Sequence, residues 1–178
     1  MTISSKPHIV NQGLMCMEEF YHTNGKLGTK LTETRGIIFV DMAPLTVLND
    51  CIRSMGFHLN SAQATAKWKM DENQLCPFMV IPNHNLYIFP HRLTKHGIVI
   101  WLNAAQIKWT SNFNRKTKIE FENGKFLMVE GKVSDFNKKL QFAEQLRKRT
   151  VEMDEDLLSF TTTPNKKQMH FRKNRKKE

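Results

Sequence analysis

Residues 97–129, GIVIWLNAAQIKWTSNFNRKTKIEFENGKFLMV, decide the class of fold. Apolar side chains recur in this stretch with a period of two, most clearly at Ile107, Trp109, Ile119 and Phe121. This period is typical of antiparallel strands that bury one face and leave the other in water, so we expect Trp109 to face a core. Asn123-Gly124 supplies the residues that a tight hairpin turn requires. The stretch therefore predicts an antiparallel sheet.

The residues before this stretch predict further strands and a helix. Asn24-Gly25 is a second hairpin signal, between strand-like residues 15–21 and 26–32. Residues 36–40, GIIFV, read as a buried strand. Pro44 suits the first turn of a helix that Gly56 would end. The apolar stripe of this helix consists of Leu45, Leu48, Ile52 and Met55.

The rest of the chain completes an α+β pattern. Residues 58–72 leave helix and strand open, while residues 78–81 and 86–89 read as strands next to prolines. Ser134 is the expected N-cap of a helix that ends near residue 152, with an apolar stripe of Phe136, Leu140, Ala143 and Leu146. We therefore predict a mostly antiparallel sheet with one helix in the first half and a long C-terminal helix, then a disordered basic tail.

This pattern also predicts the domain organisation. Residues 1–153 would form a single α+β domain. Residues 154–178 would form a flexible tail, acidic and apolar at first and then basic.

The charge of the chain indicates a polyanionic partner. The 178 residues carry a formal net charge of +10, and no Asp or Glu occurs from Asn73 to Ile119. The cations of this acid-free segment are the first candidates for phosphate contacts: Arg92, Lys95, Lys108, Arg115, Lys116 and Lys118. The tail would add non-specific affinity through Lys166, Lys167, Arg172, Lys173 and Arg175.

Nucleic acid is a better candidate than a membrane. No apolar run approaches the roughly 20 residues of a membrane-spanning helix, and no basic helix with a strong apolar face is apparent. The opening residues, MTISSKPHIV, lack the organisation of a secretory signal. We therefore expect a cytoplasmic protein that contacts no membrane.

Three histidines within residues 83–96, NHNLYIFPHRLTKH, allow three interpretations. A zinc site would need a second pair of ligands that His91 and His96 lack. A nucleophilic pair of Cys76 with His84 or His91 has no activating context. We favour the third interpretation, polar loop or edge residues that face phosphates or water beside Arg92 and Lys95. No enzyme and no metal or other cofactor is therefore expected, and the three widely spaced cysteines predict reduced, mostly buried thiols.

Two other classes of function stay open on the residues alone. An RNA-binding or general nucleic-acid module could stack bases on Trp68, Trp101 or Trp109, although their spacing favours a place in the core. A protein-interaction adaptor could use the same basic face to meet an acidic partner.

The order of landmarks resembles the ComK family of competence transcription factors over roughly residues 37–150. The landmarks are Pro44-Leu45, Cys51, Gly56, PFMVIP at 77–82, YIFP at 87–90, IWLN at 100–103, and the strand pair around Asn123-Gly124 that leads into the final helix. This chain departs from the family at residues 61–64, SAQA, where relatives carry a basic cluster. Basic residues return only at Lys67 and Lys69, which are the candidates for the corresponding contact.

The resemblance implies a transcriptional activator that binds AT-rich boxes mainly through the minor groove of duplex DNA. It implies dimers that pair on DNA and bend it, a role alongside RNA polymerase, and a place at the nucleoid. It also implies control by an adaptor of a Clp protease. Leu157, Leu158 and Phe160 are candidates for adaptor capture, or else they pack on the last helix.

Overall fold

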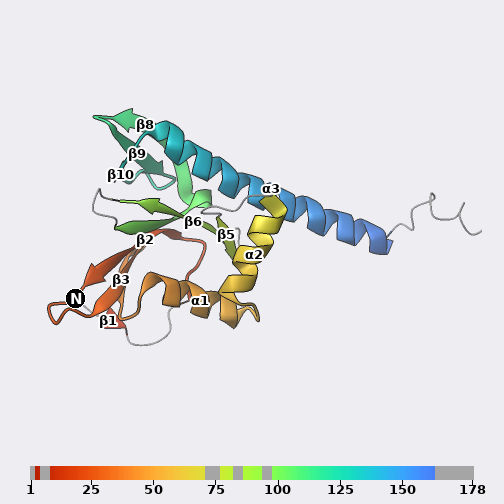
Figure 1. Ribbon diagram of the computed structural model, residues 1–178, viewed down its shortest axis with the longest axis horizontal. Helices are drawn as coiled ribbons and strands as arrows, with labels where there is room; N and C mark the ends of the chain where they lie inside the picture. Colours follow the sequence, from red (N-terminus) through yellow and green to blue (C-terminus); the bar gives the residue numbers. More distant parts are fainter. Residues whose placement is uncertain (1–2, 5–8, 71–76, 82–85, 94–97, 163–178) are drawn as a thin grey trace, which may run out of the picture. The chain divides into compact units, whose positions relative to one another are not determined.

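The computed structural model describes residues 3–4, 9–70, 77–81, 86–93 and 98–162. Contacts within the chain divide it into two units, Met1–Arg147 and Lys148–Glu178. The first unit holds two mostly antiparallel sheets and the helices that cover them (Figure 1). In the second unit the last helix continues, and Lys148 lies 3.9 Å from Glu152 one turn later. The domain boundary that the sequence predicts near residue 153 stays a prediction.

A seven-stranded sheet forms the larger half of the first unit. Its order is β1-β4-β3-β2-β7-β6-β5, and only the pair of β1 with β4 is parallel among the described strands. The strands are β1 (Ile3–Ser4), β2 (Leu14–Tyr21), β3 (Leu27–Glu33), β4 (Gly36–Val40), β5 (Phe78–Ile81), β6 (Leu86–Arg92) and β7 (Val99–Asn103). The predicted hairpin at Asn24-Gly25 is confirmed, since Gly25 joins β2 to β3 with a φ of +78°, which glycine adopts without strain.

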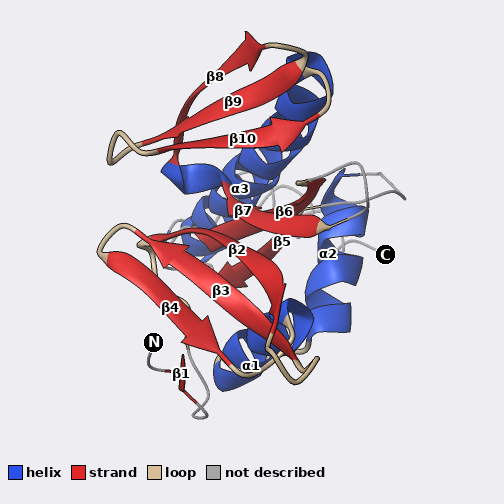
Figure 2. Ribbon diagram, turned by 90° about the vertical axis from the view of Figure 1, so that its left-hand side faces the viewer, coloured by secondary structure: helices blue, strands red, loops and turns tan. Residues whose placement is uncertain are grey.

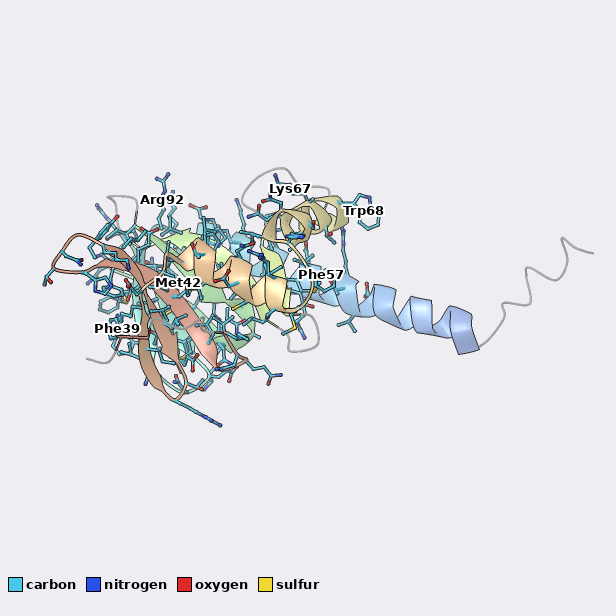
Figure 3. The ribbon with its side chains drawn as sticks, turned by 90° about the horizontal axis from the view of Figure 1, so that it is seen from below. Phe39, Met42, Phe57, Lys67, Trp68 and Arg92 are labelled. Atoms are coloured by element: carbon cyan, nitrogen blue, oxygen red, sulfur yellow. The ribbon has the colours of Figure 1, made fainter. Side chains whose placement is uncertain are left out.

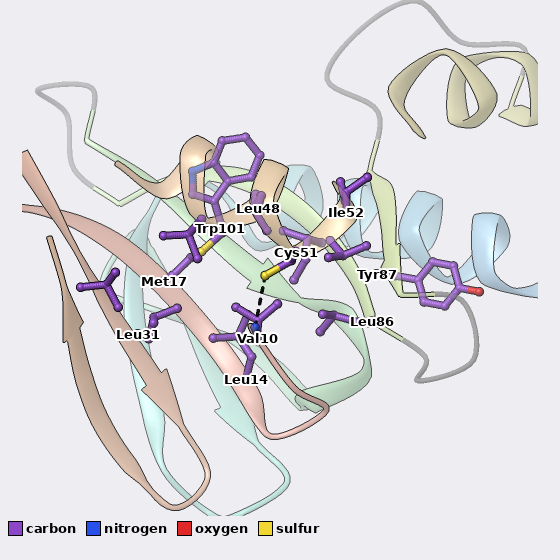
Figure 4. Close-up of a cluster of buried hydrophobic side chains, with 14 of the residues drawn as sticks. Val10, Leu14, Met17, Leu31, Leu48, Cys51, Ile52, Leu86, Tyr87 and Trp101 are labelled. Carbon is purple, nitrogen blue, oxygen red and sulfur yellow. Dashed lines mark hydrogen bonds between the residues drawn. The ribbon is translucent and has the colours of Figure 1, made fainter. Parts of the chain in front are cut away.

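Two helices, α1 (Pro44–Ser54) and α2 (Leu59–Met70), pack on one face of this sheet. Pro44 begins α1 and Gly56 follows its end with a φ of +83°, as predicted. The buried stripe is rotated from the predicted one: it contains Val47, Leu48, Cys51 and Ile52, whereas Leu45 is 47% exposed and Met55 is 41% exposed. In the core beneath α1, the Val10 amide donates a hydrogen bond to the Cys51 sulfur over 3.2 Å (Figure 4).

A three-stranded sheet and the first turns of α3 (Val133–Thr162) cover the other face of the large sheet. A 3-10 turn at Ala104–Gln106 leads from β7 into this small sheet, which has the order β10-β9-β8. Its strands are β8 (Ile107–Phe113), β9 (Lys116–Phe121) and β10 (Phe126–Glu130). In Figure 2 they lie above the large sheet, with α3 behind them. The predicted hairpin at Asn123-Gly124 joins β9 to β10, and Gly124 has a φ of +79°.

The predicted α+β fold, with mostly antiparallel strands and a C-terminal helix, is confirmed, but α3 ends at Thr162 and not near residue 152 as predicted. Residues 58–72, which the sequence left open, contain helix α2. The predicted stripe on α3 is buried at Phe136, Ala143 and Leu146. Ser134 lies inside the first turn of α3 instead of capping it, because the Asp135 and Phe136 amides donate to the Lys132 carbonyl. No described helix is long and apolar enough to span a membrane.

Trp109 does not face the core as the period of two predicts. Ile107 is opposite Phe121 on β9, but Trp109 is opposite Glu120, so β8 contains one extra residue between these two pairs. Such a β-bulge moves every later side chain to the other face of the sheet. Trp109 is therefore 67% exposed, whereas Trp101 on β7 is 9% exposed, in the core as predicted.

Candidate nucleic-acid interface

An open groove of about 1190 Å³ lies where the two sheets and the start of α3 meet. The end of β6, the turn between β8 and β9, the end of β10 and the first turns of α3 all line it. Four of its side chains are cations, Arg92, Arg115, Lys116 and Lys139, and two are acids, Glu130 and Asp135. The groove therefore gathers positive charge from segments that are far apart in the sequence.

Arg115 lies at the tip of the hairpin between β8 and β9. Phe113 and Lys116 form the last cross-strand pair, so Asn114 and Arg115 make a two-residue turn, with φ values of +48° and +64°. Asparagine tolerates this left-handed conformation at the first position of the turn. The second position of such a turn usually holds glycine, and another L-residue there destabilises the fold by about 1–2 kcal/mol. The turn thus presents an exposed guanidinium group at the groove at a cost in backbone strain.

The two lysines of the groove are held by neighbouring groups. Lys116 Nζ lies 2.9 Å from a carboxylate oxygen of Glu130. Lys139 Nζ donates a hydrogen bond to the Pro90 carbonyl over 3.3 Å. Burial, and then the charge of Arg92, lower the pKa of Lys139. A bound anion would offset both effects, so this ammonium group favours the approach of a phosphate.

His91 holds the groove together from beneath. It is 7% exposed on β6, and its Nε2 lies 3.0 Å from the Glu130 carbonyl on β10, to which it donates. Its ring meets the Phe136 ring edge-on at 5.0 Å, and its Nδ1 is buried without a hydrogen-bond partner among the described residues. Burial lowers the pKa of His91, so the neutral ring is favoured. The sequence predicted that His91 is a polar loop or edge residue that faces phosphates or water. This prediction is wrong, because His91 is buried and joins the two sheets.

Strand β6 extends beyond the predicted residues 86–89, to Arg92, because Pro90 lies where no hydrogen bond from its backbone nitrogen is needed. Strand β5 pairs with β6 only as far as Ile88, so the side of β6 where Pro90 lacks an N–H has no described partner strand at that point. On the other side Pro90 is opposite Trp101 on β7. The strand thus carries His91 into the core and Arg92 to the groove.

The remaining predicted cations lie elsewhere. Lys108 and Lys118 are on the outer face of the small sheet, where Lys108 Nζ is 3.8 Å from Glu120 and Lys118 Nζ is 4.9 Å from the centre of the Phe126 ring. Lys67 is exposed on α2, well away from Arg92 (Figure 3). The structure thus brings Arg92, Arg115 and Lys116 together at the groove, which Lys67, Lys108 and Lys118 do not line.

Several predicted residues cannot be placed. His84, His96, Lys95, Cys76 and the tail cations Lys166, Lys167, Arg172, Lys173 and Arg175 lie outside the described residues. Lys69 is on α2, and Leu157, Leu158 and Phe160 are on α3, but their side chains are not described either. Their roles stay predictions.

Sequence reasoning missed Lys139, because it lies outside the acid-free segment. Its one signal is its place one turn after Phe136 and beside Leu140 in the apolar stripe of α3, which brings a lysine close to the core. A lysine at the border of an apolar stripe is the pattern that could have identified it.

The thiols and the possible metal ligands show no reactive arrangement in the described part of the chain. Cys16 and Cys51 are buried thiols, as predicted, and burial raises the pKa of Cys16 to about 12. Burial also raises the pKa of Cys51. Among the described residues, no group of three or more His, Cys, Asp or Glu side chains could hold a metal ion.

Comparison with known proteins identifies a family. The family model described as ComK protein matches residues 5–155 of the chain. No curated protein and no solved structure matches it.

Proposed function

The chain belongs to the ComK family of competence transcription factors, and we propose that it activates genes for DNA uptake by binding duplex DNA at the groove. The observation that carries the proposal is the convergence of Arg92, Arg115, Lys116 and Lys139 from three separate segments of the fold. Cations that neutralise phosphates supply most of the affinity of a protein for DNA.

The hairpin tip supports binding through the minor groove. AT-rich DNA has a narrow minor groove whose negative potential attracts arginine. Arg115 is exposed at a two-residue turn, and Arg92, Lys116 and Lys139 lie around the same groove of the protein. In the proposed complex the Arg115 side chain enters the minor groove while the other three cations contact the flanking phosphates. This mode needs no recognition helix.

The two acids of the groove are compatible with this role. Glu130 forms an ion pair with Lys116. The charge of Asp135 raises the pKa of Lys139, against the lowering by burial and by Arg92. Glu130 thereby holds Lys116 in place and Asp135 favours the charged form of Lys139, and the groove keeps more positive than negative side chains.

The proposal includes the partners that family membership implies. The chain would bind AT-rich boxes as paired dimers, act on RNA polymerase, and work at the nucleoid in the cytoplasm without a cofactor. The tail cations would add non-specific affinity, and Leu157, Leu158 and Phe160 stay candidates for capture by a Clp-protease adaptor.

The test is a titration of the full chain with an AT-rich and a GC-rich duplex at about 150 mM salt, close to physiological ionic strength. We expect tighter binding of the AT-rich duplex and its displacement by a dye that occupies the minor groove. Arg115→Ala removes one contact with the phosphates or the groove. The slope of log K against log salt, which is negative, should therefore become shallower by about 0.9.

Arg35→Ala is the matched control. Arg35 is also an exposed arginine at the second position of a two-residue hairpin turn, between β3 and β4 of the large sheet. The Arg35→Ala variant should leave the slope of log K against log salt unchanged. Equal affinity for both duplexes, or no competition by the dye, would exclude the minor-groove activator and favour a general nucleic-acid module. Failure to bind either duplex would favour a protein-interaction adaptor.

A further inference from the structure

The outer face of the small sheet carries aromatic and basic side chains in register. Directly paired residues of antiparallel strands share a face. On the central strand β9 this face shows Lys116, Lys118 and Glu120. Their partners on the two flanking strands are Phe113, Ser111 and Trp109 on β8 and Glu130, Met128 and Phe126 on β10.

Three large aromatic side chains of this face are open to water. Trp109 is 67% exposed, Phe126 is 64% exposed and Phe113 is 55% exposed. Trp109 and Phe126 flank the same residue of β9, so they lie two strand spacings, or about 10 Å, apart. Trp109 and Phe113 are four residues apart on one strand, or about 13 Å. The three rings can therefore each accept a separate planar group.

The charges of this face favour an anionic occupant. Lys108 and Lys116 balance the two acids, at 3.8 Å from Glu120 and 2.9 Å from Glu130. Lys118 is then the cation in excess, and its ammonium group lies 4.9 Å from the centre of the Phe126 ring. A phosphate bound to Lys118 would thus lie beside a ring on which a base could stack.

This composition distinguishes between two occupants. The cores of protein–protein interfaces are depleted in lysine, glutamate and serine, but these residues fill the middle of the face. Proteins that bind single strands combine exposed aromatic rings with cations, because every base has a face that can stack. We propose that the outer face of the small sheet binds single-stranded nucleic acid, with bases on Trp109, Phe113 and Phe126 and phosphates on Lys118 and its neighbouring lysines.

This site goes beyond the proposed binding of duplex DNA and uses different side chains. Trp109, Phe126 and Lys118 do not line the groove, whereas Lys116 belongs to both surfaces. The two sites therefore meet at Lys116, and a strand that separates from a duplex at the groove could continue onto the outer face. Each site can be removed without the other, so the two proposals can fail independently.

The experiment measures binding of a fluorescent oligo(dT) 20-mer, which has no duplex structure, by anisotropy. The variant is the double substitution Trp109→Ala and Phe126→Ala in the full chain. Loss of a stacked ring weakens single-strand binding by about 5- to 150-fold per base. We expect at least a tenfold rise in Kd for oligo(dT), and affinity for the AT-rich duplex within about twofold of the original because the sites are separate.

Trp68→Ala is the matched control, since Trp68 is 73% exposed on α2 and belongs to neither site. It should leave both affinities unchanged. Because the substituted rings are exposed, circular dichroism and the urea midpoint should show a folded double variant. Trp109→Phe keeps a ring and should retain most of the affinity for oligo(dT).

Three outcomes would overturn the proposal. The chain could fail to bind oligo(dT), or the double variant could bind it as tightly as the original chain does. Alternatively, the double variant could lose self-association in sedimentation while its affinity for oligo(dT) stays constant, which would assign the face to a second copy of the chain.

Discussion

At its centre the seven-stranded sheet buries both of its faces, whereas the three-stranded sheet buries one and exposes the other. On β7 of the large sheet, Trp101 packs beneath α1 and α2, while Ile100 and Leu102 pack toward the small sheet and α3. On the small sheet, Ile119 and Phe121 enter the core, but Trp109 and Phe126 face water. The large sheet therefore serves as the framework, and the small sheet both closes the core and presents a surface.

The same contrast applies to the turns of the two sheets. Each sheet has a two-residue hairpin turn with arginine in its second position, Thr34-Arg35 in the large sheet and Asn114-Arg115 in the small one. Only the second turn has positive φ values among these four residues, and only Arg115 lines the cationic groove. Strain and charge coincide in the small sheet, as is common where backbone strain serves a function.

The largest effect should separate the two faces of the small sheet. Phe121 is 2% exposed and Phe126 is 64% exposed, although both lie next to the same hairpin turn. Phe121→Ala should lower the free energy of unfolding by about 3–5 kcal/mol because it leaves a cavity in the core. Phe126→Ala should change it by no more than about 0.5 kcal/mol. Urea titrations of the two variants measure the difference, and similar losses would mean that the outer face is covered.

The next largest effect tests the hydrogen bond by which His91 on β6 joins the large sheet to Glu130 on β10 of the small sheet. The pKa of His91 is lowered by burial, so the unfolded chain takes up this proton at a higher pH than the folded chain does. The stability that the neutral ring contributes is therefore present above about pH 6.5, the ordinary histidine pKa, and is lost as the pH falls through the lowered value.

His91→Gln keeps a neutral donor for the Glu130 carbonyl but loses the ring contact with Phe136. At pH 7.5 this variant should be about 1–2 kcal/mol less stable than the original chain. The deficit should shrink as the pH approaches 5, because only the original chain must protonate His91 on unfolding. Urea titrations at both pH values measure it, and a deficit that does not change with pH would show that His91 does not titrate in this range.

A smaller effect compares the two arginine turns. Arg115→Gly relieves the positive φ and should raise the free energy of unfolding by about 0.5–1 kcal/mol, while it weakens binding to duplex DNA. Arg35→Gly should lower the free energy by a similar amount, because glycine adds freedom to the unfolded chain without relieving a positive φ. Thermal melts of both variants give the two signs. The comparison of turns fails if both variants change stability in the same direction.

The smallest effect concerns the surface ion pairs of the small sheet. Lys108 and Glu120 are 3.8 Å apart, with side chains 57% and 39% exposed. Pairs this exposed contribute about 0–1 kcal/mol, so Lys108→Ala should leave the urea midpoint nearly unchanged. A loss as large as that of Phe121→Ala would contradict the view that the charges of this face serve a partner and not the fold.

Much of the fold follows from local signals. Asn24-Gly25 and Asn123-Gly124 predicted their hairpins correctly, because few residues other than Gly and Asn adopt the required φ values at low cost. Gly56 predicted the end of α1 for the same reason, and Pro44 predicted its start because a fixed φ and a missing N–H suit the first turn of a helix. The acid-free segment pointed to Arg92, Arg115 and Lys116, which line one groove, since a run of one sign is visible in the sequence without any knowledge of contacts.

The site depends on pairing across long distances. The period of two placed Trp109 in the core, but a bulge opposite β9 turned it to the outer face. The sequence predicted that His91 lies in a basic loop, but β6 continues through Pro90 and buries it.

The sequence by itself determined the hairpin turns, the limits of α1, the α+β class and the excess of positive charge. These features depend on the conformations open to single residues and on composition. Only the tertiary structure decided which cations share a groove, why Lys139 joins them, and which aromatic rings meet water. Those outcomes depend on strand register and on the packing of α3, and a shift of one residue between paired strands reverses the face of every side chain that follows.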